Sequence, residues 1–198
     1  MDLMGRSGVF VLLLTGVISL AILSTGCTGP APAPIPAVAP NATGLFVVSD
    51  NFSNGGTIPT QFTCQGANVS FPLSWSKAPA GTQTIAILMQ DLDTPRPGFT
   101  HWILYNIPYE SRGIPGNITT APVLPDGSVQ GKNDAGKIGY TGPCPPPGKP
   151  HRYVITVYAL NRSLDGSGAL NRSEFDAAIN GAVVGQGNLS GTYERSPT

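Results

Sequence analysis

Charged side chains are scarce in this chain, and neither sign is in excess. The 198 residues include 11 Lys or Arg and 11 Asp or Glu, which gives a formal net charge of zero at pH 7. A nucleic-acid-binding protein normally carries a basic excess or stripe that neutralises phosphates, so the composition argues against a nucleic-acid partner. The 20 prolines and 25 glycines favour a β-rich fold with many loops.

Histidine and the motifs of common enzymes are nearly absent. The chain has two histidines, His101 and His151, and neither belongs to a His-x-x-x-His or His-Glu-x-x-His motif. Those spacings are typical of helical zinc sites. No Gly-x-Ser-x-Gly elbow precedes a predicted helix. We therefore expect no metal and no cofactor, and we keep weak hydrolysis by an Asp/His cluster only as a third alternative.

Long hydrophobic runs are missing too, apart from one at the N-terminus. Val9–Leu23 follows Arg6 and leads to Ser24-Thr-Gly-Cys27, a pattern typical of a secretory signal. The Gly-Cys ending favours a lipoprotein signal in which Cys27 is acylated, although Ser24 stands where Leu is usual. The alternative is an uncleaved anchor of about 17 apolar residues. Both interpretations place the rest of the chain outside the cytoplasm, anchored to the cell membrane.

The segment after this signal is predicted to be a stalk. Residues 28–43 are rich in Pro and Ala and cannot bury enough apolar surface to fold. They favour an extended polyproline-type conformation of roughly 3 Å per residue. The predicted organisation is therefore a targeting segment at 1–27, a stalk at 28–43 and one β domain at 44–198.

Cysteine is limited to three residues. If Cys27 is acylated, Cys64 and Cys144 remain, an even number in an oxidising compartment. We predict a disulfide between them. The chain-entropy model gives such a link about 4–5 kcal/mol of stabilisation.

Asparagine, in contrast, is concentrated in Asn-x-Ser/Thr sequons. Seven of the eleven asparagines begin one, which favours a heavily N-glycosylated exterior surface. The alternative is that Asn, Ser and Thr simply crowd into turns. The sequon asparagines are Asn41, Asn51, Asn68, Asn117, Asn161, Asn171 and Asn188.

Short segments rich in β-branched and aromatic residues predict a mainly β domain. A C-terminal helix is expected after Asn171, with Glu174 completing a capping box and Val183 on its apolar stripe, and Gly185 is expected to end it. We expect two antiparallel sheets packed face to face, with this helix against them. The predicted strands are 45–48, 71–75, 84–91, 101–107 and 152–160.

The residues that can carry function flank these strands. Asp91 ends one apolar strand, and His101 and His151 open two others, the second after the rigid Gly/Pro loop 142–150. In an antiparallel arrangement these ends can meet at one rim and form a small polar pocket. Tyr153 is two residues after His151, so both side chains project from the same face. For each histidine, the alternative is a buried imidazole bonded to a backbone carbonyl.

These motifs, in their order, resemble the phosphatidylethanolamine-binding protein family, and most of all its bacterial and archaeal Raf-kinase-inhibitor-like branch. The resemblance covers about residues 45 to 195, and Leu92 stands where the family usually has Pro. The matching motifs are Asp91-Leu-Asp-Thr-Pro95, His101-Trp102, Asn106-Ile-Pro108, Gly142-Pro-Cys-Pro-Pro-Pro-Gly148 and His151-Arg-Tyr153.

The resemblance implies a large antiparallel sheet packed on a smaller one, with peripheral helices. It also implies a small pocket for phosphate, phosphorylethanolamine or acetate-like groups. Two imidazoles, a phenol and loop N–H groups would bind such an anion, and Asp91 would orient a histidine. The matching residues are Asp91, Asp93, His101, Gly142, Pro143, His151 and Tyr153.

The function expected from these observations is binding of small anions or phospholipid headgroups by a membrane-tethered module outside the cytoplasm. Its partners would be the anion itself and the membrane that holds the N-terminus. A regulator or inhibitor of a protease or another protein partner is the main alternative.

Overall fold

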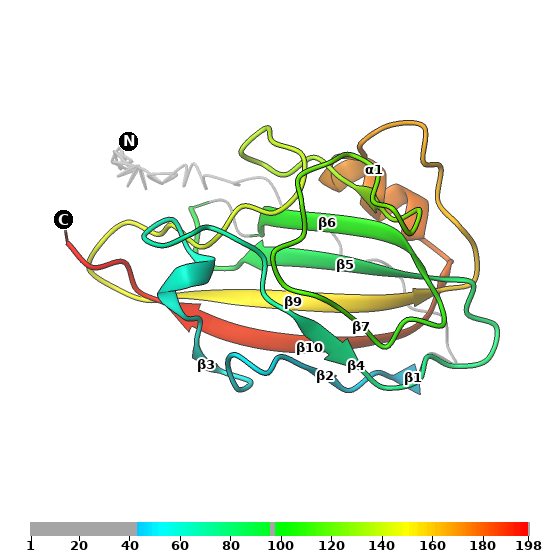
Figure 1. Ribbon diagram of the computed structural model, residues 1–198, viewed down its shortest axis with the longest axis horizontal. Helices are drawn as coiled ribbons and strands as arrows, with labels where there is room; N and C mark the ends of the chain where they lie inside the picture. Colours follow the sequence, from blue (N-terminus) through cyan, green and yellow to red (C-terminus); the bar gives the residue numbers. More distant parts are fainter. Residues whose placement is uncertain (1–42, 96–97, 198) are drawn as a thin grey trace, which may run out of the picture. The chain divides into compact units, whose positions relative to one another are not determined.

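The computed structural model describes residues 43–95 and 98–197 (Figure 1). The predicted targeting segment, Cys27, Asn41 and the stalk up to residue 42 lie outside the described residues, so these assignments stay predictions. No helix in the described part of the chain is long and apolar enough to cross a membrane.

Four long strands form the centre of a seven-stranded sheet, in the order β10, β9, β5 and β6, and each is antiparallel to its neighbour. Short strands extend both edges: β1 and β3 pair in parallel with β10, and β8 pairs with β6. The bounds are β1 Thr43–Gly44, β3 Gly56–Thr57, β5 Thr84–Asp91, β6 Phe99–Pro108, β8 Val129–Gln130, β9 His151–Leu160 and β10 Val183–Tyr193.

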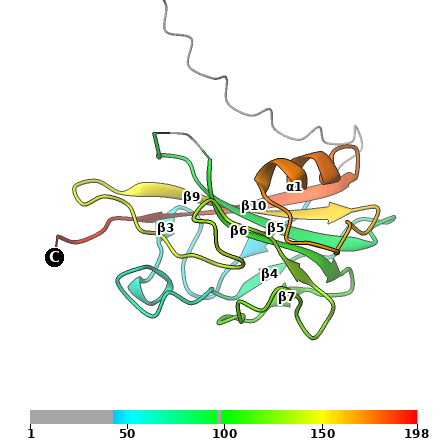
Figure 2. The same cartoon turned by 90° about the horizontal axis from the view of Figure 1, so that it is seen from above.

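The two faces of this sheet are covered by different elements (Figure 2). A three-stranded sheet lies on one face, and the one α-helix of the described residues lies on the other. The predicted fold, a large antiparallel sheet packed on a smaller one with a C-terminal helix, is therefore confirmed. The remaining elements are β2 Val47–Val48, β4 Leu73–Trp75, β7 Gly113–Ile114, the 3-10 helix η1 Thr60–Phe62 and α1 Arg172–Ile179.

Strand β5 lies at the centre of the core. Ile85, Ile87 and Met89 belong to the apolar cluster between the two sheets. Ala86 and Leu88 belong to the cluster beneath α1. Because successive strand residues face opposite sides, covering both faces requires the nearly continuous apolar sequence that predicted this strand.

The predicted strands are present, with shifted ends. β4 starts at Leu73, and β2 covers only Val47–Val48 of the predicted first strand. His101 is the third residue of β6 rather than its first, because the ladder with β5 already starts at Phe99.

The helix prediction is correct at its start and wrong at its end. Asn171 and Glu174 form the expected capping box. The helix stops at Ile179, shortly before Gly181, which has a φ of +71°. Val183 and Gly185 lie in β10 and not in the helix, so β10 is a strand that the sequence pattern missed.

The glycines of β10 explain why its pattern is weak. A Cβ at Gly187 would lie 2.0 Å from the carbonyl oxygen of Leu45, and one at Gly191 would lie 2.6 Å from Cγ1 of Ile58. Such distances leave no room for a side chain, so these glycines mark close contact with neighbouring chain segments.

The predicted disulfide is present. Cys64 and Cys144 are bonded, with their Cα atoms 5.4 Å apart. The backbone N–H of Cys64 also donates to the carbonyl oxygen of Pro143, at 3.1 Å. The link therefore fastens the Gly/Pro loop to the segment that follows η1.

Candidate functional site

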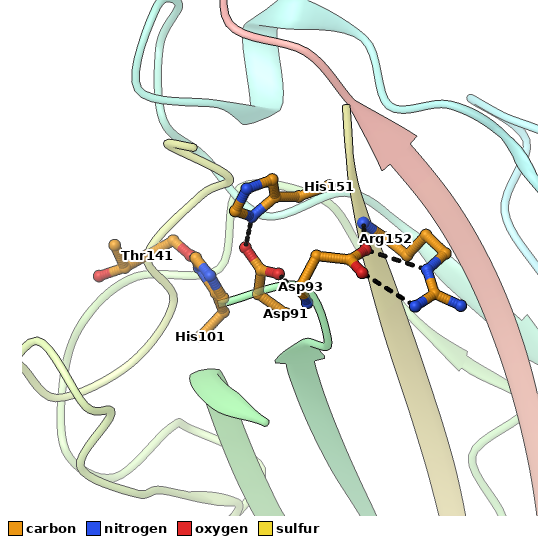
Figure 3. Close-up of polar contacts among 6 residues, drawn as sticks. All are labelled: Asp91, Asp93, His101, Thr141, His151 and Arg152. Carbon is orange, nitrogen blue, oxygen red and sulfur yellow. Dashed lines mark hydrogen bonds and ion pairs between the residues drawn. The ribbon is translucent and has the colours of Figure 1, made fainter. Parts of the chain in front are cut away.

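The antiparallel register brings the predicted site residues to one end of the large sheet. Asp91, the last residue of β5, pairs with Phe99 of β6 on one side and with Tyr153 of β9 on the other. His101 and His151 are each two residues away from these partners. The expected meeting of strand ends at one rim is therefore present, and Figure 3 shows Asp91 close to both histidines.

A buried carboxylate–imidazole pair forms the centre of the site. Nδ1 of His151 lies 2.8 Å from Oδ2 of Asp91, and the two residues are only 6% and 2% exposed. The other oxygen of Asp91 accepts from the backbone N–H of Asp93, at 2.8 Å. A carboxylate beside Nδ1 favours the proton on that nitrogen and fixes the ring orientation, which leaves Nε2 of His151 for another partner.

His101 is oriented by a backbone carbonyl. Its Nδ1 lies 2.8 Å from the carbonyl oxygen of Thr141. A carbonyl oxygen can only accept, so Nδ1 carries the proton, and Nε2 of the neutral ring presents a lone pair. Burial lowers the pKa of His101, while this hydrogen bond and the charges of Asp91 and Asp134 act in the opposite direction.

Tyr153 contributes a buried hydroxyl. Its ring packs edge-on against His101, with centroids 5.3 Å apart. Among the described residues, its hydroxyl has no hydrogen-bond partner of normal geometry. Burial and the nearby Asp91 raise the pKa of Tyr153, so the hydroxyl keeps its proton at neutral pH.

Asp93 faces Arg152 rather than the histidines (Figure 3). Its Oδ2 accepts from the backbone N–H and from Nε of Arg152, at 2.8 and 3.0 Å, and its Oδ1 accepts from Nη2 at 2.9 Å. These bonds lower the pKa of Asp93 from 3.8 to about 2. The pair joins the turn after β5 to the start of β9, so Asp93 holds the rim in place. Its predicted contact with a ligand stays a prediction.

We expect Asp93→Asn to weaken the pH dependence of stability in acid. Because the pKa of Asp93 is lower in the folded state, its stabilisation is complete above 3.8 and is lost as the pH falls to about 2. The effect is small, because the ion pair is exposed to solvent. Urea unfolding at about pH 5 and about pH 2.5 measures it. An equal loss of stability in wild type and variant would contradict this assignment.

Gly142 and Pro143 are buried, and Gly142 packs against the segment that contains Phe62 and Asn68. A Cβ on Gly142 would lie 2.3 Å from the carbonyl oxygen of Phe62, so only glycine fits. Its N–H donates to Oδ1 of Asn68, at 2.8 Å, and is therefore already engaged. Pro143 has no N–H to offer.

Two residues that position the site were not predicted from the sequence. Thr141 sets the tautomer of His101, and Asn68 holds the loop through Gly142. Asn68 was identified only as a sequon. No local signal connects it with a loop that is distant in the sequence.

The described residues contain no group of three or more His, Cys, Asp or Glu that could hold a metal ion. What the site can do chemically follows from its two imidazoles. In the neutral state they offer lone pairs at Nε2, and in the protonated state they offer N–H donors to an anion.

Comparisons with known proteins agree with this architecture. The family model described as phosphatidylethanolamine-binding protein matches residues 48–194. A UPF0098 protein of Methanothermobacter thermautotrophicus is 44% identical over 144 residues, which cover 73% of this chain and 95% of that protein. A protein of Mycobacterium tuberculosis described as a candidate lipoprotein, LppC, is 39% identical over 79% of this chain and 75% of its own length.

A solved structure shows the same similarity. Escherichia coli YbcL, described as a member of the mammalian phosphatidylethanolamine-binding protein family, is similar with a TM-score of 0.70. Its sequence is 31% identical, and the similarity covers 77% of this chain and 99% of YbcL.

Proposed function

The chain belongs to the phosphatidylethanolamine-binding protein family, and on this premise we propose that it binds small anions at the end of β5, as a membrane-tethered module outside the cytoplasm. The ligand class is phosphate or a phosphate-bearing headgroup such as phosphorylethanolamine.

The observation that carries the proposal is the contact of Asp91 with His151, beside a second buried histidine. Asp91 fixes the orientation of the His151 ring, so that Nε2 is left to face a ligand beside the second imidazole. The hydroxyl of Tyr153 adds support, because this buried donor lies near Asp91 without a hydrogen bond of normal geometry to any described residue. A group that entered the site could accept this hydrogen bond.

The exterior location rests on separate observations. The similarity to LppC supports membrane attachment through a lipidated cysteine, for which Cys27 is the candidate. A disulfide is typical of an oxidising compartment. The six sequon asparagines within the described ranges are all exposed, which suits glycosylation; they are Asn51, Asn68, Asn117, Asn161, Asn171 and Asn188.

Titration calorimetry tests the binding function. We expect phosphate and phosphorylethanolamine to bind wild-type protein weakly, because few atoms are contacted. His151→Ala should lower the affinity about tenfold or more, since one of the two imidazole contacts to the anion is lost. Lys77→Ala is the control, because it removes an exposed cation outside the site. Absence of binding heat with wild type, or equal affinity of wild type and His151→Ala, would contradict the proposal.

A second experiment separates a lipid headgroup from free phosphate. Vesicles containing phosphatidylethanolamine and vesicles of phosphatidylcholine alone are compared for binding of the folded domain. Retention on the first kind only, with competition by phosphorylethanolamine, identifies the headgroup as ligand. Binding of free phosphate without vesicle binding identifies the free anion. A stable protein partner recovered from intact membranes, without any anion binding, would favour the regulator alternative.

A further inference from the structure

A groove opens where the chain passes from the large sheet to the small one. β1 pairs with β10, whereas β2, three residues later, pairs with β4. The separation leaves a cavity of about 410 Å³, which is within the size range of small-molecule sites. Its lining consists of Leu45–Ser49, Phe52–Asn54, Asn188 and Leu189.

Phe46 in this groove is unusually exposed. Its exposed fraction is 72%, above that of the other exposed large hydrophobic residues in the described ranges, which do not exceed 55%. An aromatic ring exposed to water does not contribute the stabilising free energy that its burial would give. A partner that covers the ring would therefore be stabilising.

Phe46 and Asn188 are both exposed residues whose two chain neighbours are buried. Gly44 pairs with Gln186 in a parallel ladder. Phe46 lies beyond the end of β1, and its backbone bonds to Ser76, after β4, rather than to β10. Phe46 and Asn188 both line the groove. A group attached to the amide nitrogen of Asn188 can therefore lie against the ring of Phe46.

The amide of Asn188 is available for such an attachment. Asn188 is exposed and begins the sequon Asn-Leu-Ser. Among the described residues, no sequon asparagine donates a hydrogen bond from Nδ2. Two asparagines outside sequons do: Asn106 donates to Leu164, and Asn133 donates to Gly139 and Thr141. The side-chain amides of Asn106 and Asn133 therefore hold the fold together, whereas, in the part of the chain that the structure describes, Nδ2 of Asn188 makes no hydrogen bond that a glycan would break.

We propose that Asn188 carries an N-linked glycan whose first pyranose packs against Phe46 in this groove. The C–H face of a pyranose is apolar and suits an aromatic ring. Its hydroxyls can bond to the polar wall formed by Ser49, Ser53 and Asn54. The proposal rests on the exterior location proposed above, since glycan transfer occurs on exported chains.

The modification is a substitution at the first sugar carbon. A transferase supplies a lipid-linked sugar phosphate or diphosphate. The bond from Nδ2 to C1 forms as the C1–O bond to the phosphate breaks, the amide loses one proton, and the lipid phosphate leaves. Ser190 is the hydroxyl residue of this sequon, and in the folded protein its hydroxyl donates to Asn54. The transfer is therefore expected before β10 pairs with its neighbours, while Ser190 is still free.

Mass spectrometry of the full chain, isolated from the membranes of the cells that produce it, tests the attachment. Trypsin releases residues 173–195, in which Asn188 begins the one sequon. We expect this peptide to carry a glycan, with a fragment equal to the peptide plus one sugar residue. Finding residues 173–195 only in unmodified form would overturn the proposal. If other sequon peptides carry sugars in the same digest, the exterior location still stands.

Thermal unfolding tests the contact with Phe46. Phe46→Ala is expected to lower the Tm of the glycosylated protein by about 2 °C, and to have less than half that effect in Asn188→Gln. Tyr109→Ala, which removes another exposed aromatic ring, should act equally in both backgrounds. Equal effects of Phe46→Ala in both backgrounds would overturn the contact. Anion binding by Asn188→Gln should match wild type, so failure of the anion proposal is detected separately.

Discussion

Removing the disulfide with Cys64→Ala and Cys144→Ala together is expected to lower the free energy of unfolding by about 4–5 kcal/mol. The bond closes a loop with a sequence separation of 80, and the unfolded chain regains the entropy of that loop when the bond is absent. For a domain of this size we expect Tm to fall by about 10–15 °C. Differential scanning calorimetry of wild type and double variant measures the change.

Reduction of the wild-type protein provides the matched control. Once thiol titration confirms two free cysteines, its Tm should fall to that of the double variant. A single Cys→Ala variant is unsuitable, because the remaining thiol can form bonds between molecules. A drop in Tm of less than about 3 °C in both the reduced protein and the double variant would contradict the prediction.

The loss should also reach the site, since the disulfide holds the loop that orients His101. Thr141, whose carbonyl bonds to this histidine, is three residues before Cys144. With the bond removed, we expect anion affinity to fall even at temperatures where the domain remains folded.

Much of the central sheet could be predicted from the sequence because its strands are buried on both faces. β5 is therefore a nearly continuous apolar run and β9 consists largely of β-branched and aromatic residues, and these patterns predict strands directly. The capping box of α1 is similarly local, since Asn171 and Glu174 satisfy each other's backbone groups.

β10 shows the opposite case. Its glycines at 187 and 191 are required by Leu45 and Ile58, which are distant in the sequence, and they remove the alternating pattern by which a strand is recognised. The apolar residues before them then extended the helical pattern of α1 too far. Contacts with distant segments determine this strand, and a local pattern cannot contain them.

The site divides in the same way. Asp91 and His151 could be selected because each lies at the end of an apolar strand, and their contact is present. The partner of His101 could not be predicted, because a backbone carbonyl is identical at every residue and only the folded loop brings that of Thr141 to the ring. That carbonyl determines which nitrogen of His101 carries the proton, and so what the ring offers to a ligand.

Anion binding by this site is expected to take up protons. Nδ1 of His101 donates to Thr141, and Nδ1 of His151 lies beside Asp91, so each neutral ring presents a lone pair at Nε2. A lone pair repels an anionic oxygen, whereas a protonated Nε2 attracts it. Because burial lowers the pKa of His101 in the free protein, that ring is neutral at pH 7 and must gain a proton when the anion binds.

The affinity should therefore rise as the pH falls. Uptake of one proton per anion, by His101, gives about a tenfold increase in affinity per pH unit between about pH 8 and about pH 6.5. Sulfate is the suitable probe, because it does not titrate in this range. Calorimetry in buffers of different ionisation enthalpy counts the protons directly. Affinity that is independent of pH, with equal heats in all buffers, would contradict the mechanism.

The same lowered pKa makes the unliganded fold sensitive to acid. Below the unfolded value of 6.5, the unfolded chain binds a proton at His101 that the folded protein does not, so stability falls as the pH decreases toward the lowered folded pKa. A bound anion favours the protonated ring, so sulfate should restore the lost stability below that pH. Glutamine does not titrate, so His101→Gln should remove the contribution of His101 to the pH dependence of anion affinity and to the pH dependence of stability. If it removed neither, the tautomer set by Thr141 would not control binding.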